Sequence, residues 1–249
     1  MTIKHIIAIA SGKGGVGKST VAVNLALALA QTGARVGILD ADIYGPSQPA
    51  MLGAMERPVL EGKTFLPIQR YGIQAMSIGY LTDESAPVIW RGPMVSMAMQ
   101  QMLRDTQWGE LDYLVVDLPP GTGDIQLTLS QKIPLRGAIV VTTPQDLALL
   151  DVRKACEMFK KLNVPILGIV ENMSIYTCPH CGQQSQIFGS GGGQQLAKEY
   201  DLEVLASLPL DIRIREMTDS GCPPVVAEPE GEQAKRFIDL AQKVIQRVK

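Results

Sequence analysis

The segment Gly12-Lys13-Gly14-Gly15-Val16-Gly17-Lys18-Ser19-Thr20 constrains the fold of this chain more than any other. Residues Gly12 to Ser19 match G-x-x-x-x-G-K-[ST], a loop whose backbone N–H groups point inward around phosphate oxygens. The apolar run His5–Ala10 predicts a strand before the loop, and the spacing of Lys18–Gln31 predicts a helix after it. We therefore expect nucleotide phosphates at the positive N-terminal end of that helix, with Lys18 on the outer phosphates and Ser19 on Mg²⁺.

Further apolar runs, rich in Ile and Val, alternate with segments of helical spacing. The runs are Arg35–Leu39, Asp112–Val116, Gly137–Val141, Pro165–Val170 and Glu203–Leu208, and the helical segments are Gly92–Asp105, Asp146–Leu162 and Gly192–Glu199. Runs with little alternation between apolar and polar residues indicate strands that are buried on both faces of a parallel sheet. The predicted class is α/β, with a doubly wound, mostly parallel sheet flanked by helices.

Length and composition favour one domain over residues 1–249, because 249 residues with 46% apolar content can bury one sizeable core. Pro and Gly residues interrupt the strand–helix rhythm between about 53 and 90, which we interpret as an insertion with a hairpin. The last segment, Gly231–Lys249, places apolar residues on one helical face. We expect this helix to pack on the sheet, with a membrane-surface anchor as the alternative.

The charge balance argues against a general attraction to polyanions. The chain has 23 Lys and Arg against 25 Asp and Glu, so neither nucleic acid nor a membrane is an expected partner. No apolar stretch of the sequence approaches the ~20 residues that span a bilayer. The four cysteines stand in a sequence without an export signal, which indicates free thiols or ligands. We therefore expect a reducing, cytoplasmic setting.

Acidic residues follow two further predicted strands, at the edge where open α/β sheets bind ligands. Asp40 and Asp42 end the second strand, and Asp117 opens the sequence D-L-P-P-G. We expect Asp42 to hold the attacking water and help to bind Mg²⁺, and Asp40 to support Mg²⁺ or the loop. Alternatively, either residue caps a helix near Pro46. Asp117 would bind Mg²⁺ through water, and the Gly121 N–H could follow the γ-phosphate.

Lys13 is a second cation inside the phosphate loop, and by itself it could be a solvated side chain. The run K-G-G-V-G-K-S-T resembles the deviant Walker A loop of the MinD, ParA, nitrogenase iron protein and ArsA ATPases. In that subclass the first Lys reaches across a nucleotide-sandwich dimer to the phosphates of the other subunit. The resemblance implies an ATPase that forms a homodimer, with Lys13 stabilising charge like an arginine finger beside the catalytic residues Lys18 and Asp42.

Two segments at the same edge are candidates for base recognition. Val170-Glu171-Asn172-Met173 ends a predicted strand, and an Asn side chain can both donate to and accept from a purine. In the resembling ATPases an Asn at this place reads adenine. The segment Leu208-Pro209-Leu210-Asp211 resembles their second base-contacting loop. Pro209 and Asp211 could equally be structural turn residues.

The sequence Thr177-Cys178-Pro179-His180-Cys181-Gly182 lies in a predicted loop at about 173–190. Its C-x-x-C spacing lets the thiolates of Cys178 and Cys181 converge on one metal ion or cluster. A tetrahedral zinc or a [4Fe–4S] cluster usually takes four ligands, so a two-fold dimer would supply two from each subunit. A structural zinc knuckle and a thiol–disulfide centre are the alternatives.

Several unusual motifs occur together between about Ile6 and Val226: D-A-D-I-Y-G-P-S, W-R-G-P, D-L-P-P-G-T-G-D, E-N-M-S and C-P-H-C-G. Their order resembles the Mrp/ApbC family of ATP-binding iron–sulfur cluster carriers, from which the residues after Gly182 depart slightly. The resemblance implies that Cys178 and Cys181 of two subunits bridge a labile [4Fe–4S] cluster. It also implies slow ATP hydrolysis coupled to cluster transfer, with cluster scaffold proteins and iron–sulfur apoproteins as partners.

Two other functions fit parts of the sequence. A positioning ATPase like MinD or ParA would act through lipid or DNA, and the cysteine loop argues against it. A zinc-stabilised nucleotide-binding dimer would use the same two thiolates without turnover. The metal content of anaerobically purified protein separates both from a cluster carrier.

Overall fold

A sheet of eight strands runs through the part of the chain that the computed structural model describes, residues 2–81 and 92–248. Its order is β12-β9-β8-β1-β7-β2-β6-β5, and each neighbouring pair is parallel except β6 with β5. The strands are β1 (Thr2–Ser11), β2 (Val36–Asp40), β5 (Ile68–Arg70), β6 (Ile73–Ser77), β7 (Glu110–Asp117), β8 (Gly137–Thr142), β9 (Ile166–Glu171) and β12 (Val204–Ser207). The predicted α/β class with a mostly parallel sheet is confirmed.

Burial explains the near-continuous apolar runs of the sequence. Every residue of β2 and of β8 is buried, as expected for strands that are covered on both faces. β1 begins at Thr2 rather than at the predicted His5, because its first residues pair with β7 while alternating between exposed and half-buried positions. This mixed stretch lies outside the apolar pattern from which the start was predicted.

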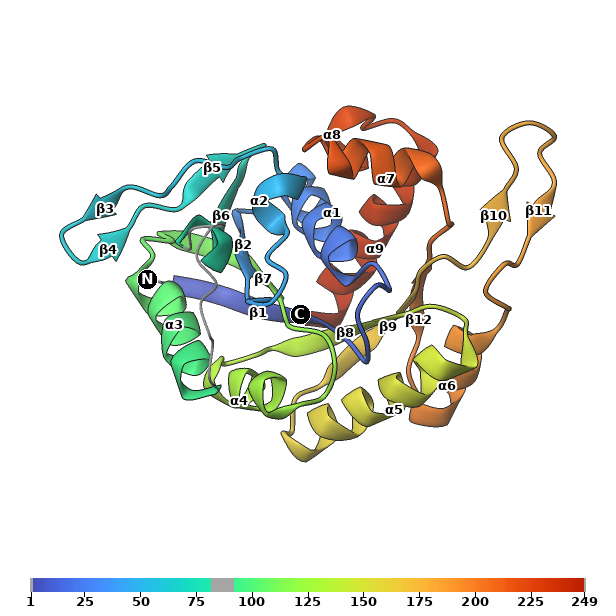
Figure 1. Cartoon of the computed structure of the whole chain (residues 1–249), viewed down its shortest axis with the longest axis horizontal. Helices are drawn as coiled ribbons and strands as arrows, with labels where there is room; N and C mark the ends of the chain where they lie inside the picture. The colour runs from blue at the N-terminus through green and yellow to red at the C-terminus, as the bar shows by residue number, and fades with distance from the viewer. Residues whose placement is uncertain (1, 82–91, 249) are drawn as a thin grey trace.

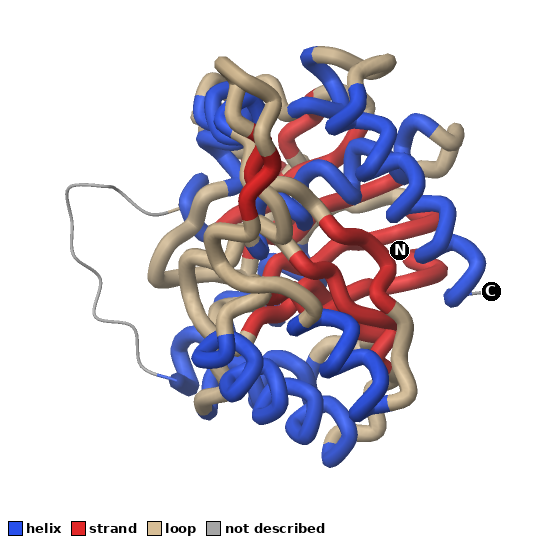
Figure 2. The backbone as a smooth tube through the Cα atoms, turned by 90° about the vertical axis from the view of Figure 1, so that its right-hand side faces the viewer, coloured by secondary structure: helices blue, strands red, loops and turns tan. Residues whose placement is uncertain are grey.

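Helices cover both faces of the sheet, so that the strands form a middle layer (Figures 1 and 2). One face carries α1 (Lys18–Gln31), α2 (Gln48–Met51), α7 (Ile212–Asp219), α8 (Pro224–Ala227) and α9 (Glu232–Val248). The other carries α3 (Gly92–Asp105), α4 (Asp124–Lys132), α5 (Asp146–Lys161) and α6 (Gly192–Tyr200). The apolar pattern does not reveal α4 and α7, because their buried faces include the polar residues Gln126, Ser130 and Thr218.

The region that the sequence marks as an insertion is partly built into the sheet. β3 (Leu60–Glu61) and β4 (Thr64–Phe65) form a hairpin that extends away from the body, whereas β6 pairs with β2 (Figure 1). A short 3₁₀ helix, η1 (Ile78–Tyr80), follows β6. Residues 82–90 of the predicted insertion, and Trp90 and Arg91 of W-R-G-P, lie outside the described residues.

The C-terminal helix α9 packs against the body, as expected from its apolar face. Its buried residues are Ala234, Phe237, Leu240, Ala241, Val244 and Val248. Among the helices of the described residues, none combines the length and the apolar character needed to cross a bilayer.

The carboxyl ends of the parallel strands bring the predicted site residues to one edge of the sheet. The phosphate loop, residues 12–20, follows β1, while Asp40 ends β2 and Asp117 ends β7. Beyond β9, the strands β10 (Tyr176–Thr177) and β11 (Gln184–Ser185) form the cysteine hairpin, residues 176–185, which projects from the body (Figure 1). The nucleotide and cysteine motifs therefore share this edge.

Candidate functional site

The phosphate loop depends on glycine at its last turn. Gly17 has a φ of 84°, in the left-handed region, and it is the N-cap residue of α1. A Cβ at Gly17 would lie 2.2 Å from Asn172 Nδ2, which donates to the Val16 carbonyl at 2.8 Å. A larger residue would be strained and would displace Asn172. Because Gly17 has no side chain to cap α1, the first N–H groups of this helix remain available to an anion.

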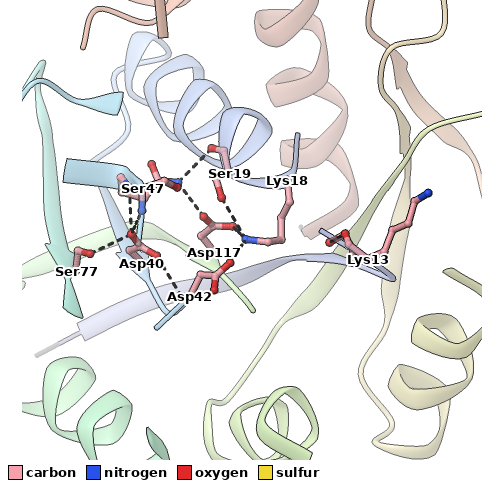
Figure 3. A network of polar contacts seen from close by, with 10 residues as sticks. Lys13, Lys18, Ser19, Asp40, Asp42, Ser47, Ser77 and Asp117 are labelled. Carbon is pink, nitrogen blue, oxygen red and sulfur yellow. Dashed lines mark hydrogen bonds and ion pairs between the residues drawn. The ribbon is translucent and has the colours of Figure 1, made fainter. Parts of the chain in front are cut away.

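Lys18 lies within the acidic cluster, which consists of Asp40, Asp42 and Asp117 (Figure 3). Its Nζ is 2.5 Å from Asp117 Oδ1 and 3.4 Å from Asp42 Oδ2, and it donates to Ser19 Oγ at 3.2 Å. Asp40 and Asp117 are fully buried, and Asp42 is 8% exposed. The Lys18 ammonium offsets one of the negative charges that these carboxylates carry when they are ionised.

Burial opposes the ionisation of Lys18, Asp40 and Asp42. It acts against the Lys18 ammonium, but the charges of Asp117, Asp42 and Asp40 outweigh it and raise the pKa of Lys18. Burial, followed by repulsion from Asp117, raises the pKa of Asp40 to about 7. Burial also raises the pKa of Asp42, although the charge of Lys18 works in the opposite direction. A further cation would therefore stabilise the ionised cluster.

The donor set at this place fits Mg²⁺, which prefers carboxylate, hydroxyl, phosphate and water oxygens. Among the described residues, no three His, Cys, Asp or Glu side chains converge on a possible metal position. The protein would therefore contribute one or two groups, the Ser19 hydroxyl and the Asp117 carboxylate, the latter through water. Phosphate and water oxygens would complete the coordination shell. Bound there, Mg²⁺ supplies positive charge against the phosphate oxygens.

Asp40 is held by the loop that follows it. Its Oδ1 accepts from the Asp42 N–H at 3.1 Å. Its Oδ2 accepts from the N–H groups of Ser47 at 3.0 Å and Gln48 at 3.1 Å, and from the Ser77 hydroxyl at 3.0 Å. With both oxygens engaged, Asp40 holds the loop and the start of α2, which agrees both with the expected support of the loop and with the alternative that this residue caps a helix near Pro46.

Gln48 and Ser77 are site residues that the sequence patterns do not reveal. The buried Gln48 side chain donates from Nε2 to Asp117 Oδ2 at 2.9 Å and to the Ser19 carbonyl at 3.1 Å. Its place directly after D-A-D-I-Y-G-P-S is the signal that could have found it. Ser77 does not stand out in the sequence because its strand, β6, lies in the segment that the Pro and Gly residues mark as an insertion.

Lys13 and Gly121, both expected to contact phosphate, are each hydrogen-bonded to another residue of the chain. Lys13 points away from the acidic cluster (Figure 3), and its Nζ lies 3.4 Å from Gln145 Oε1, just before α5. The Gly121 N–H donates to the Ser11 carbonyl at 2.9 Å. The γ-phosphate contact expected of Gly121 therefore requires this bond to break.

A cavity of about 180 Å³, here called the base cavity, opens beside the phosphate loop. It brings together the three residues expected to recognise the base, Asn172, Pro209 and Asp211, and its wall includes Gly17 and Thr20. The Asp211 carboxylate also caps α7, because it accepts from the Arg213 N–H at 2.8 Å and from Gln233 Nε2 at 2.7 Å. Asp211 therefore has the structural role considered for it and also lines the base cavity.

The tip of the cysteine hairpin is a tight turn. The Cys178 N–H donates to the Gln183 carbonyl at 2.9 Å, and the Gly182 N–H donates to the Cys178 carbonyl at 2.9 Å. Cys178 is half-buried and Cys181 is exposed. Hydrogen bonds from the backbone of Cys181 and His180, and from the Cys181 side chain, lower the pKa of the Cys178 thiol. This turn favours a thiolate at Cys178, the form that binds metals.

Comparison with known proteins identifies the family. The family model ParA, described as NUBPL iron-transfer P-loop NTPase, matches residues 2–245. The chain is 58% identical over 242 residues to the iron-sulfur cluster carrier protein of Pseudomonas fragi, covering 96% of this chain and 84% of that protein. It is 56% identical over 244 residues to the Escherichia coli (strain K12) protein of the same name, covering 97% and 66%. It is also 51% identical over 250 residues to the iron-sulfur cluster transfer protein NUBPL of Mus musculus, covering 99% and 78%.

Solved structures agree with this assignment. The nucleotide-binding protein from Archaeoglobus fulgidus, solved in complex with ADP, superposes with a TM-score of 0.81 at 40% identity, over 94% of this chain and 92% of that one. The cell division ATPase MinD of Pyrococcus furiosus superposes with a TM-score of 0.73 at 25% identity, over 97% and 98%. The resemblance seen in the sequence motifs is confirmed along nearly the whole chain. This chain belongs to the NUBPL/Mrp family of iron–sulfur cluster carrier P-loop NTPases.

Proposed function

We propose that this protein is an ATP-dependent carrier that holds a [4Fe–4S] cluster between two copies of itself and transfers it to apoproteins. The observation that carries the proposal is the contact between the cysteine hairpin and the nucleotide site. Leu210, from the base loop Leu208–Asp211 that borders the base cavity, donates its N–H to the Ile175 carbonyl at 2.8 Å, just before the hairpin. The names of the bacterial and mouse relatives support the same function.

Cys178 and Cys181 of each copy would supply the four thiolates that a [4Fe–4S] cluster takes. Transfer is then a ligand exchange without change of oxidation state. A bond from iron to an acceptor thiolate forms as the bond to Cys178 or Cys181 breaks, and the released thiolate takes up a proton. The partners in this proposal are scaffold proteins that load the cluster and iron–sulfur apoproteins that receive it. The setting is cytoplasmic, with neither nucleic acid nor membrane as a partner.

The phosphate loop Gly12–Thr20 would bind ATP, with the phosphates replacing Asp117 as the partner of Lys18. Asp42 would hold the attacking water. As the water oxygen attacks the γ-phosphorus, the bond to the β–γ bridging oxygen breaks, and the water protons end on phosphate or solvent. Lys13 of the second copy would stabilise the charge that develops on the transferred group.

Anaerobic reconstitution with iron and sulfide tests the cluster assignment. We expect about two iron and two sulfide per chain, in a brown species with the mass of a dimer. Cys178→Ala and Cys181→Ala should each lose the iron. Cys222→Ala, which removes a half-buried thiol outside the hairpin, should keep it.

Two results would contradict the cluster assignment: zinc in place of iron in anaerobically purified protein, or unchanged iron in the Cys178→Ala/Cys181→Ala double variant. Transfer is measured by mixing the loaded dimer with an apo-ferredoxin, with and without Mg-ATP. Loading no faster than with free iron and sulfide would contradict the carrier role. ATP-dependent cosedimentation with liposomes or DNA would favour a positioning ATPase instead.

A further inference from the structure

Glu171 is a buried carboxylate that neither the nucleotide chemistry nor the cysteine chemistry proposed here uses. It ends β9 and is 3% exposed, and its Oε2 accepts from the Gly193 N–H at 2.5 Å. Gly193 lies in the first turn of α6, the helix that follows the cysteine hairpin. Glu171 thus connects the end of a sheet strand to the segment that returns from the cysteines.

The sequence of α6 explains why this helix needs a carboxylate from elsewhere. Its N-cap residue is Gly191, which has no side chain, and its first turn contains no acidic residue. The first N–H groups of a helix carry partial positive charge and require acceptors. A Cβ at Gly193 would lie 2.8 Å from Glu171 Oε2 and 3.0 Å from Glu171 Cβ. Glycine therefore permits an approach that a larger residue would prevent.

The residue next to Glu171 touches the nucleotide site. Asn172 donates from Nδ2 to the Val16 carbonyl of the phosphate loop at 2.8 Å, and it borders the base cavity. The Glu171 carbonyl accepts from the Leu208 N–H of the base loop at 2.8 Å. Glu171 and Asn172, which are consecutive at the end of β9, therefore contact the phosphate loop, the base loop and the start of α6.

The cysteine hairpin is anchored on both sides, to the base loop where the chain leaves the body and to this strand end where it returns. On the outgoing side, Ser174 donates to the Leu208 carbonyl from its N–H at 2.9 Å and from its hydroxyl at 3.0 Å. On the returning side, Gly193 is bound to Glu171. Between these anchors the hairpin extends from the body (Figure 1). A small displacement of either anchor would therefore move Cys178 and Cys181 together.

We propose that Glu171 is a positioning residue that transmits nucleotide occupancy to the cysteine hairpin. The inference rests on the proposed carrier function, but it concerns the coupling and not the cargo. A nucleotide that rearranges the Asn172 contact shifts the end of β9, and the Glu171 carboxylate carries this shift to Gly193 and the returning segment. The accessibility of the two thiols then depends on the nucleotide.

Hydrogen–deuterium exchange on the cluster-free protein tests this inference, with Mg-ATP as the probe. In the wild type, Mg-ATP should change the exchange of residues 176–193 by up to about tenfold, the effect of one hydrogen bond. Glu171→Ala should lose most of this change while binding ATP within about threefold of the wild-type affinity, because the substitution removes a side chain that binds Gly193 and does not line the base cavity. Glu171→Gln keeps an acceptor for the Gly193 N–H, so it should retain the change.

Gly193→Ala provides a second variant should Glu171→Ala fail to fold, because its Cβ would push the returning segment away from an intact Glu171. Gln194→Ala, at an exposed position in the same turn, is the matched control and should respond like the wild type. A full Mg-ATP response in Gly193→Ala, or in a folded Glu171→Ala, would overturn the inference. So would a wild type that binds ATP without any change in residues 176–193. The carrier function is read separately, from the iron content of reconstituted protein.

Discussion

Lys18 Nζ lies 2.5 Å from Asp117 Oδ1, inside a buried cluster that also holds Asp40 and Asp42. We propose above that the same ammonium binds the outer phosphates of ATP. In that proposal, nucleotide binding exchanges the buried partner of Lys18 from a carboxylate to a phosphate. The energetics of the acidic cluster would then influence both the stability of the protein and its affinity for nucleotide.

Lys18→Met should destabilise the nucleotide-free protein, because it leaves the buried carboxylates without their cation. We expect a loss of about 3 kcal/mol in the free energy of unfolding near pH 8. The loss should be smaller near pH 5.5, because carboxylates with raised pKa values take up protons instead. Urea denaturation at both pH values measures the difference. Equal losses would contradict the ion-pair interpretation, and the double variant Lys18→Met/Asp117→Asn should regain part of the stability.

Asp40 should make stability depend on pH in the neutral range. Burial raises its pKa to about 7 in the folded protein, so the fold holds a proton that the unfolded chain has released. This contribution is complete below about pH 4 and is lost as the pH rises through about 7, with a slope of up to about 1.4 kcal/mol per pH unit. Asp40→Asn should remove that slope, although it also lowers stability because an amide cannot accept all of the Asp40 hydrogen bonds.

Unfolding free energies from about pH 5 to about pH 8 check the slope. Asp239→Asn, which changes an exposed carboxyl on α9, is the control and should follow the wild type. An undiminished slope in Asp40→Asn would show that another group binds the proton.

Gln48→Leu should lower the affinity for the Mg²⁺ ion that supports nucleotide binding. The substitution keeps the volume of a buried side chain but removes the amide that donates to Asp117 Oδ2 at 2.9 Å. Residues that orient a metal ligand typically contribute about 10- to 100-fold to metal affinity. A Mg²⁺ titration of fluorescent ATP-analogue binding measures the shift, with Gln69→Leu at an exposed position of β5 as control. If the variant needs the same Mg²⁺ concentration as the wild type for nucleotide binding, Gln48 contributes only to packing and does not orient a metal ligand.

Local signals predicted the fold well. The phosphate loop and the apolar runs carry their information within a few residues, and the bounds of α1 and α3 were predicted to the residue. The roles of Gln48 and Glu171 could not be predicted in this way. Gln48 contacts Asp117 across 69 positions, and Glu171 contacts Gly193 across 22. Such contacts depend on the sheet topology, which places distant strand ends side by side.

Cys178 should react with iodoacetamide at a lower pH than an ordinary thiol. Backbone donors at Cys181 and His180 favour its thiolate and lower its pKa, so the midpoint of the alkylation rate should fall below about 8.5. Peptide mapping of the cluster-free protein gives the rate at Cys178 itself. His180→Ala keeps the backbone donor and should keep the midpoint. A midpoint at or above that of a free cysteine would contradict the proposed turn electrostatics.

Lys13→Ala should abolish most ATP hydrolysis while leaving ATP binding intact. Lys13 Nζ lies 3.4 Å from Gln145 Oε1 and points away from the acidic cluster of its own subunit (Figure 3). If it acts on the phosphates of a second copy, its loss should lower the turnover number by roughly 10³-fold, as for an arginine finger supplied in trans. Lys154→Ala, which removes an exposed cation from α5, should hydrolyse ATP like the wild type.

Mixing two inactive variants distinguishes action across the dimer from action within one subunit. In a mixed dimer of Lys13→Ala and Asp42→Ala, one nucleotide site combines an intact Asp42 with Lys13 from the other subunit. That site should hydrolyse ATP, so mixing should restore activity that neither variant has alone. If Lys13 instead served the phosphates of its own subunit, each site of the mixed dimer would lack one of the two residues. The mixture would then stay inactive, which would exclude the role of Lys13 across the dimer.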